Sequence, residues 1–364
     1  MPRTGDHADR RLNRAGSRSG AAEPIQLELP LAYLGSVNAW LLLGEPLTLI
    51  DTGAATDEDL AALELGLATQ GVEVEQLELI LLTHHHLDHS GLATTLQQRS
   101  GAKIAAHRTT ASWGADYRAR ADAEQAFTRE LMAAHGVPED VIDSSDDFFA
   151  MILANGRPFE TDLVLVDGDR VTAGDRTLRV VHRPGHSTSD TLFVDEDSDD
   201  AYVGDHLLAN ITSGVELMPT DAQGAERRQG LAEYLGNLRK TEVMPLRHCY
   251  TGHGPTITDH RALISERIAF HADRLERVRQ LVQDGNQSAY DVARHLWSDE
   301  TAAAQPVLVT WEVLGHLDLL VNRGAVREEI DSHGLRRFSP RAPTTDRSPS
   351  DSNVQVDVSA ETRR

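Results

Sequence analysis

Nine consecutive residues, Thr83–Gly91, concentrate side chains that bind metal ions. They read Thr-His-His-His-Leu-Asp-His-Ser-Gly, with four histidines and one aspartate between positions 84 and 89. Neutral imidazole and carboxylate are the ligands that borderline divalent metals such as zinc prefer. Histidines two positions apart can reach one metal ion, and the aspartate with its neighbouring histidine can reach a second ion close by. The pattern predicts a metal site rather than an ordinary polar loop.

Three later segments each place a further ligand type in a turn-like setting. His186 lies in Arg-Pro-Gly-His-Ser, Asp205 follows a short apolar run, and His253 lies in Thr-Gly-His-Gly-Pro. The histidine-rich motif itself follows the apolar run 77–82, which is typical of a short buried strand. Ligands at the ends of buried strands are aimed by a rigid scaffold. We therefore expect these four segments to form one site.

In their order along the chain, the four motifs resemble those of the metallo-β-lactamase superfamily, specifically its glyoxalase II-like dinuclear hydrolases. The resemblance covers residues 25–258 and implies a four-layer αββα sandwich. Carried over residue by residue, it places the family's ligands on seven positions. One metal takes His84, His86 and His186, the second takes Asp88, His89 and His253, and Asp205 bridges both.

Such a pair of metals implies a hydrolytic reaction. Two divalent ions about 3.5–4 Å apart can share a water, lower its pKa and polarise a carbonyl or phosphoryl oxygen. A metal-bridging hydroxide is then the expected nucleophile, with Asp88 and Asp205 as the carboxylates of the catalytic centre. Zinc is the expected metal, with iron or manganese as alternatives. We expect hydrolysis of an ester-like bond, with a thioester or other small acyl substrate first.

Three other activities stay open: a metallo-ribonuclease, a lactonase and a mononuclear-iron persulfide dioxygenase. His86 stands where the diiron, oxygen-reducing branch of the superfamily typically has a glutamate, so the chain resembles the hydrolytic branch. The formal net charge of -22 argues against a nucleic-acid partner. Residues 257–338 are also acidic, with ten Arg and no Lys against thirteen Asp and Glu, giving 10 − 13 = −3.

Several polar residues beside the motifs are interpreted as structural. His85 is expected to point away from its neighbours, and His182, His206 and His248 are expected to satisfy local hydrogen bonds. The Asp-Thr-Gly turn at Asp51 receives no catalytic role. Accordingly, Asp205→Asn should reduce turnover by orders of magnitude, whereas His85→Ala should have a mild effect on it.

The chain is long enough for one large domain and a smaller one. We expect a disordered extension at 1–23, a catalytic domain at 24–258 with a helical insertion or substrate lid at 112–159, a helical, winged-helix-like domain at 259–338, and a disordered tail at 339–364.

Periodicity and turn residues predict the individual elements. Expected strands lie at 27–34, 39–43, 47–50, 77–82, 103–106, 191–194, 201–203 and 243–251, with a hairpin pairing 163–166 and 171–181. Expected helices lie at 57–70, 91–99, 115–135, 223–238, 260–283, 289–297 and 307–322, with an acidic turn at 143–147 and a small hairpin at 326–338.

Targeting signals are not evident. No stretch approaches the roughly 18 apolar residues that a membrane span needs, and the Arg-rich start lacks the apolar core of a signal peptide. We therefore expect a cytoplasmic enzyme acting on a small molecule, with no membrane partner. The oligomeric state stays open. The single Cys249 excludes an intramolecular disulfide.

Overall fold

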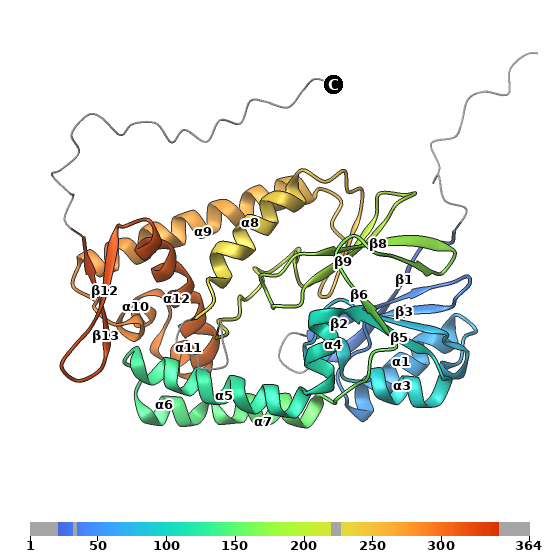
Figure 1. Ribbon diagram of the computed structural model, residues 1–364, viewed down its shortest axis with the longest axis horizontal. Coiled ribbons are helices and arrows are strands. Elements are labelled where there is room, and N and C mark those ends of the chain that lie inside the picture. Colours follow the sequence, from blue (N-terminus) through green and yellow to red (C-terminus); the bar gives the residue numbers. More distant parts are fainter. Residues whose placement is uncertain (1–20, 32–34, 220–226, 342–364) are drawn as a thin grey trace, which may run out of the picture.

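Two β-sheets packed face to face form the centre of the protein, and helices cover their outer faces (Figure 1). The computed structural model describes residues 21–31, 35–219 and 227–341. The predicted extension at 1–23 therefore lies almost wholly outside the described residues, as does most of the predicted tail.

The first sheet has six strands in sequential order. Its first three strands are antiparallel, and the last four, β3 to β6, are mutually parallel. The strands are β1 (Ile25–Leu31), β2 (Gly35–Leu42), β3 (Thr48–Ile50), β4 (Leu79–Leu82), β5 (Lys103–His107) and β6 (Leu163–Leu165).

The second sheet has five strands in the order β11-β10-β9-β8-β7. Only β10 and β11 are parallel to each other. The strands are β7 (Arg170–Ala173), β8 (Arg176–His182), β9 (Thr191–Asp195), β10 (Ala201–Gly204) and β11 (Cys249–Thr251).

Strand β4 shows why the sequence builds a layered core. Its four residues are all apolar and buried, because both faces of the sheet are covered. Leu79 and Leu81 point into the cluster between the sheets, whereas Ile80 and Leu82 point outward. The outward cluster includes residues of α1 (Asp57–Thr69) and α3 (Ala93–Ser100).

The outer face of the second sheet packs against α8 (Gly230–Glu242), whose Leu231, Leu235 and Leu238 share a cluster with β-strand residues Val181 and Leu192. Helix, sheet, sheet and helix thus form four layers, which confirms the predicted αββα sandwich. The predicted helix at 223–238 begins later, at Gly230, and residues 220–226 lie outside the described part. The predicted strand 243–251 is shorter, because only its last three residues pair with β10.

The predicted pairing of 163–166 with 171–181 is wrong. Leu163–Leu165 instead extends the first sheet beside β5, and the hairpin joins β7 to β8 in the second sheet. Gly174 and Asp175 form its turn with φ of 54° and 61°, the left-handed backbone that two-residue hairpins favour. The chain therefore crosses from one sheet to the other at 166–169.

The insertion contains more helix than predicted. It consists of α4 (Arg108–Ala115), α5 (Tyr117–Ala134), α6 (Glu139–Ser144) and α7 (Asp146–Asn155). The supposed acidic turn is a break between two helices, because Asp146 and Asp147 occupy the first turn of α7, where carboxylates offset the helix dipole.

The C-terminal region is helical and ends in a hairpin, as predicted. Its elements are α9 (His260–Gln283), α10 (Ala289–Leu296), α11 (Asp299–Ala304), α12 (Pro306–Asn322), β12 (Val326–Ile330) and β13 (Arg336–Pro340). Ser288 and Asp291 form the expected capping box of α10. The predicted tail starts too early, because Ser339 and Pro340 pair with β12.

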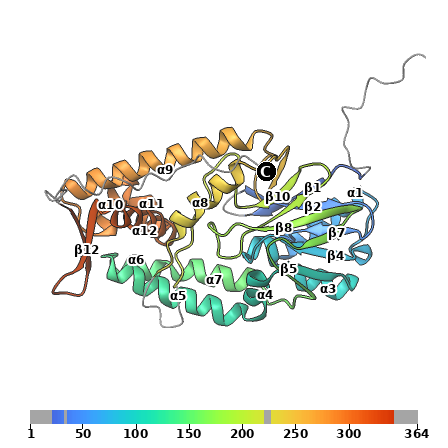
Figure 2. The ribbon, with the colours of Figure 1, turned by 45° about the horizontal axis from the view of Figure 1, so that its top comes forward.

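Helices α10 to α12 lie between α9 and the insertion (Figure 2). Met132, Ile142 and Phe149 of the insertion share one buried cluster with α9 and α12. The insertion thus joins the sandwich to the C-terminal helices. Among the described residues, no helix is long and apolar enough to cross a membrane.

Two stacked imidazoles link the sheets near the ends of β5 and β8. The rings of His107 and His182 lie 4.0 Å apart at an interplanar angle of 19°. His107 Nδ1 also accepts the backbone N–H of Thr109 and so caps α4. Burial, followed by the positive charges of His182 and Arg108, lowers the pKa of His107 to about 4.

This stack should make the fold sensitive to mild acid. A histidine with a folded-state pKa of about 4 stays neutral while the unfolded chain protonates near 6.5, so stability falls as the pH drops from 6.5 toward 4. His107→Asn keeps a capping acceptor but removes this titration. Urea unfolding at pH 7 and pH 5 should therefore show a smaller loss of stability in the variant than in the wild type. Equal losses would show that His107 is not the group responsible.

Candidate metal centre

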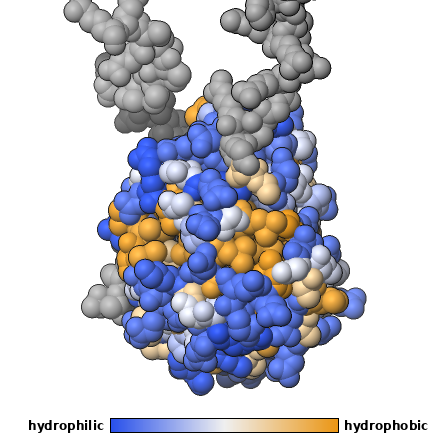
Figure 3. Space-filling view, turned by 90° about the vertical axis from the view of Figure 1, so that its right-hand side faces the viewer, coloured by the Kyte–Doolittle hydropathy of each residue, from blue (hydrophilic) through white to orange (hydrophobic). Residues whose placement is uncertain are grey.

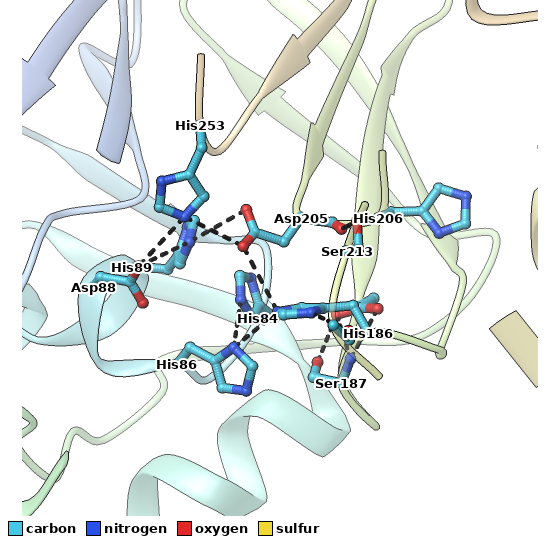
Figure 4. A network of polar contacts seen from close by, with 12 residues as sticks. His84, His86, Asp88, His89, His186, Ser187, Asp205, His206, Ser213 and His253 are labelled. Atoms are coloured by element: carbon cyan, nitrogen blue, oxygen red, sulfur yellow. Dashed lines mark hydrogen bonds and ion pairs between the residues drawn. The ribbon is translucent and has the colours of Figure 1, made fainter. Parts of the chain in front are cut away.

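The ends of strands bring the predicted ligands together. Strands β4 and β10 end directly before Thr83 and Asp205, β11 ends two residues before His253, and β8 leads into the loop that carries His186. The short helix α2 (Leu87–Ser90) holds the rest of the histidine-rich motif against the sheet edge. Figure 4 shows all seven predicted ligands around one centre, with Asp205 in the middle.

The first group consists of His84, His86 and His186, whose ligand atoms lie within 4.8 Å of one another. His86 Nδ1 lies 3.1 Å from His84 Nε2 and 2.9 Å from His186 Nε2. These three nitrogens therefore converge on one point.

The second group consists of Asp88, His89 and His253, again within 4.8 Å. His253 Nε2 lies 3.4 Å from Asp88 Oδ2 and 3.3 Å from Asp205 Oδ2. Asp205 also faces the first group, because its Oδ2 lies 3.6 Å from His186 Nε2. The carboxylate of Asp205 thus stands between the two groups, as expected for a shared ligand.

Hydrogen bonds on the far side of each ring fix which nitrogen faces the centre. His186 Nδ1 donates to the carbonyl of Gly214 (2.7 Å), and His253 Nδ1 donates to the carbonyl of Ser36 (2.7 Å). A carbonyl oxygen only accepts, so Nε2 of each ring can present its lone pair to a metal.

The remaining rings are fixed through Asp51 and a buried glutamate. Thr83 Oγ1 donates to Asp51 Oδ2 (2.7 Å), which leaves the hydroxyl to accept from His84 Nδ1 (3.0 Å). His89 Nδ1 lies 2.9 Å from the same carboxylate oxygen, and His86 Nε2 contacts Glu216 Oε1. In all five rings, the nitrogen without such a partner points to the centre.

Several of these inward atoms are buried and have no hydrogen-bond partner among the described residues: His89 Nε2, His253 Nε2 and Asp205 Oδ1. Buried polar atoms without partners are costly. A pair of divalent cations would satisfy them, so the residues present fit the metals that the family uses.

Charges at the centre shift several pKa values strongly. Burial alone would lower the pKa of His253, but Asp205 and Asp88 raise it to about 10. Burial would also lower the pKa of His86, but the negative charge of Glu216 outweighs this effect and raises that pKa to about 9. Burial raises the pKa of Asp88, yet His89 and His253 bring it down to about 2. Without metal, His86 and His253 are thus imidazolium groups beside an ionised Asp88.

Glycines allow the loops to approach this closely. A Cβ at Gly252 would lie 2.1 Å from Asp205 Oδ1 and 2.6 Å from His89 Cε1. Gly204, with φ of 49°, would bring a Cβ within 2.6 Å of Thr83 Oγ1. Any side chain at these positions would displace the centre.

The other motif histidines have local partners, as expected. His182 Nε2 donates to the carbonyl of Thr188, His206 Nε2 lies 2.9 Å from Thr241 Oγ1, and His248 Nδ1 lies 2.8 Å from Asp200. Figure 4 shows His206 pointing away from the seven predicted ligands.

His85 packs the insertion onto the metal loop. Its ring stacks on Trp113 of α4 at 3.9 Å and 15°, and its Nδ1 lies 2.7 Å from Ser189 Oγ. It belongs to neither predicted ligand group, although its Nε2 comes within 3.6 Å of Glu216. Burial lowers its pKa to about 3, so it stays neutral.

His85→Ala is therefore expected to affect stability more than turnover. The change opens a cavity beneath Trp113 and removes the contact with Ser189, which should cost about 2–4 kcal/mol of unfolding free energy. Chemical unfolding and initial rates on the same preparation would test this. A large loss of turnover in a variant of near wild-type stability would contradict the structural role.

Two acidic residues matter more than their sequence context indicates. Asp51, for which no catalytic role was predicted, orients both Thr83 and His89. Glu216 was not predicted at all. The signal in the sequence was its place between two apolar residues, Val215 and Leu217, both of which are buried in the structure. An acidic residue buried with such neighbours needs a partner.

One cleft with a partly apolar lining lies away from this centre. A cleft of about 630 Å³ is lined by Leu79, Leu163 and Val171, at the opposite end of the parallel strands from the ligands. Figure 3 shows patches of apolar surface among polar residues on the face that it views. Val164, which also lines the cleft, is exposed.

Comparison with known families and proteins agrees with the geometry. Residues 32–274 match the family model described as metallo-beta-lactamase superfamily. The chain belongs to the metallo-β-lactamase superfamily. Residues 275–341 match a second model, described as metallo-beta-lactamase-like, C-terminal domain, and the boundary between the two matches falls inside α9. Enzymes of this superfamily bind divalent metals, and curated relatives of this chain are named as a metallo-hydrolase and a thioesterase, so the chain is a metal-dependent hydrolase.

Among curated proteins, the chain is 29% identical over 305 residues to the probable metallo-hydrolase YqjP of Bacillus subtilis, covering 83% of this chain and 92% of that protein. It is 28% identical over 152 residues to an atrochrysone carboxyl ACP thioesterase of Aspergillus fumigatus, covering 42% and 43%.

Among solved structures, a metallo-beta-lactamase family protein from Thermus thermophilus superposes with a TM-score of 0.73 at 29% identity, covering 87% of this chain and 98% of that one. A beta-lactamase domain protein from Burkholderia ambifaria has a TM-score of 0.76 at 25% identity, covering 91% and 96%.

Proposed function

We propose that this protein hydrolyses an ester-like bond with the help of two divalent metal ions. The substrate that we favour is a thioester or another small acyl compound, and the metal that we favour is zinc. The observation that carries the proposal is the pair of complete ligand groups on either side of Asp205. A structural zinc site typically has four protein ligands of its own, so two such sites would need eight residues. Here seven residues serve both ions because Asp205 is shared, which leaves room for water and substrate.

The chain's residues have distinct roles in this proposal. His84, His86 and His186 would hold one ion, Asp88, His89 and His253 the other, and Asp205 both. The ions would supply a water of lowered pKa and polarise the acyl oxygen. Hydrolysis adds the water oxygen to the acyl carbon and breaks the carbon–sulfur bond, which releases a carboxylate and a thiol.

Similarity to a protein named as an acyl carrier thioesterase favours a thioester over other ester-like bonds. The matched part of that protein is less than half its length, so its own substrate is not assigned to this chain. The insertion bears on the choice of acyl group, because α4 reaches the metal loop through Trp113. We propose that the helices α4 to α7 form one wall of the acyl site.

The test is hydrolysis of a panel of short acyl thioesters by protein loaded with zinc, with metal-free protein beside it. Turnover that requires metal would support the proposal. Protein with two bound ions and no thioester turnover would contradict it. RNA and lactones on the same preparation would then identify a ribonuclease or lactonase, and one bound iron with oxygen consumption would identify a persulfide dioxygenase.

A further inference from the structure

One short segment between β10 and α8, Ser213–Glu216, touches residues from three separate ligand motifs. Ser213 Oγ donates to the backbone carbonyl of Asp205 at 2.6 Å. Gly214 accepts from His186 Nδ1 at 2.7 Å, and Glu216 N donates to the carbonyl of His186 at 3.0 Å. The segment therefore fixes both the backbone and the ring of His186.

Glu216 extends this segment to the third motif. Its Oε1 accepts a hydrogen bond from His86 Nε2, so His86 Nδ1 faces the other two nitrogens of the first group. The carboxylate is only 4% exposed, and its Oε2 is buried without a hydrogen-bond partner among the described residues. Burying a carboxylate is costly unless a charged partner compensates it, and His86 is that partner.

The second group is supported differently. Asp51 contacts His89 at 2.9 Å, and a backbone carbonyl, that of Ser36, fixes His253. Asp51 also reaches the first group, because it accepts from Thr83 Oγ1, which in turn contacts His84. Glu216, in contrast, contacts a histidine of the first group alone, so its removal should weaken that group and leave the second in place.

We propose that Glu216 is a positioning residue that sets the metal affinity of the first group, His84, His86 and His186, independently of the second. This rests on the proposed function, because it takes the first group to be a metal site. A carboxylate behind a ligating histidine orients the ring and makes its ligand nitrogen more basic, and losing it typically costs about 10–100-fold in metal affinity.

The test uses Glu216→Gln, which keeps the side-chain shape and an oxygen acceptor but removes the charge. Glu124→Gln is the matched control: Glu124 is also buried and near Glu216, and no hydrogen bond to its carboxyl is seen among the described residues. Zinc affinity would be measured by competition with a chromophoric chelator, and each group's occupancy by anomalous diffraction at limiting zinc.

In Glu216→Gln, the first group should lose about 10–100-fold in affinity and empty first, while the second group stays at wild-type affinity. Glu124→Gln should match the wild type at both groups. Glu216→Asp, which restores the charge on a shorter side chain, should recover part of the affinity. With cobalt in place of zinc, the visible absorption of the first group should change in Glu216→Gln alone.

Several results would overturn the proposal. One is a Glu216→Gln variant that binds zinc at both groups with wild-type affinity; this result would not contradict the proposed function. Another is equal weakening of both groups, or a Glu216→Asp variant as weak as Glu216→Gln, because the effect would then not be a local one of charge. Wild-type protein that takes up no ion at the first group would overturn the inference and the proposed function together.

Discussion

Asp205→Asn is expected to reduce metal-dependent turnover by at least about a hundredfold. Asp205 Oδ2 lies within 3.6 Å of His186 and 3.3 Å of His253, so its charge serves both ligand groups at once. Asparagine has nearly the same shape but is neutral, and its amide nitrogen cannot bind a metal through a free lone pair. The variant should therefore hold two ions poorly and misplace any that remain.

The measurement is the initial rate on the best thioester of the panel, with bound metal counted in the same samples. His85→Ala is the control, because His85 is buried beside the centre but belongs to neither predicted ligand group. A separation of at least about tenfold between the two variants is expected. Comparable losses of turnover in both variants would show that Asp205 contributes no more to turnover than a buried polar residue outside the predicted ligand groups.

Removing the metals with a chelator is expected to abolish turnover and to be reversed by zinc. In the metal-free protein the pKa of His86 is about 9 and that of His253 about 10, so both rings are protonated on both nitrogens and positively charged at neutral pH. Metal binding must displace these protons, and the apparent metal affinity should therefore rise from pH 6 to about pH 9.

The stability of the metal-free protein should instead fall as the pH rises. A raised histidine pKa stabilises the metal-free fold below the unfolded value of 6.5, and this stabilisation is lost as the pH rises through 9 to 10. Calorimetric titration in buffers of different ionisation enthalpy would count the protons released. Zinc binding without proton release at pH 7 would contradict the presence of imidazolium groups in the metal-free centre.

The ligand set was predictable from sequence because its chemistry is local. Four of the seven predicted ligands lie within six consecutive positions, and each of the other three follows a recognisable strand and turn. The β4 run was equally clear, since a strand buried on both faces is apolar at every position. The pairing of Leu163–Leu165 was not predictable, because a three-residue apolar run fits either sheet and only tertiary contacts choose between them.

The superfamily, the layered fold and the side chains able to bind metal could therefore all be inferred from sequence. Which nitrogen of each ring faces the centre could not, because the partners that fix the rings are distant in the chain: Asp51 is 38 positions from His89, and Glu216 is 130 positions from His86. A hydrogen bond depends on distance and direction in space, and no local pattern records that two such residues meet. The seven predicted ligands form one centre because the strands end at the same edges of two packed sheets.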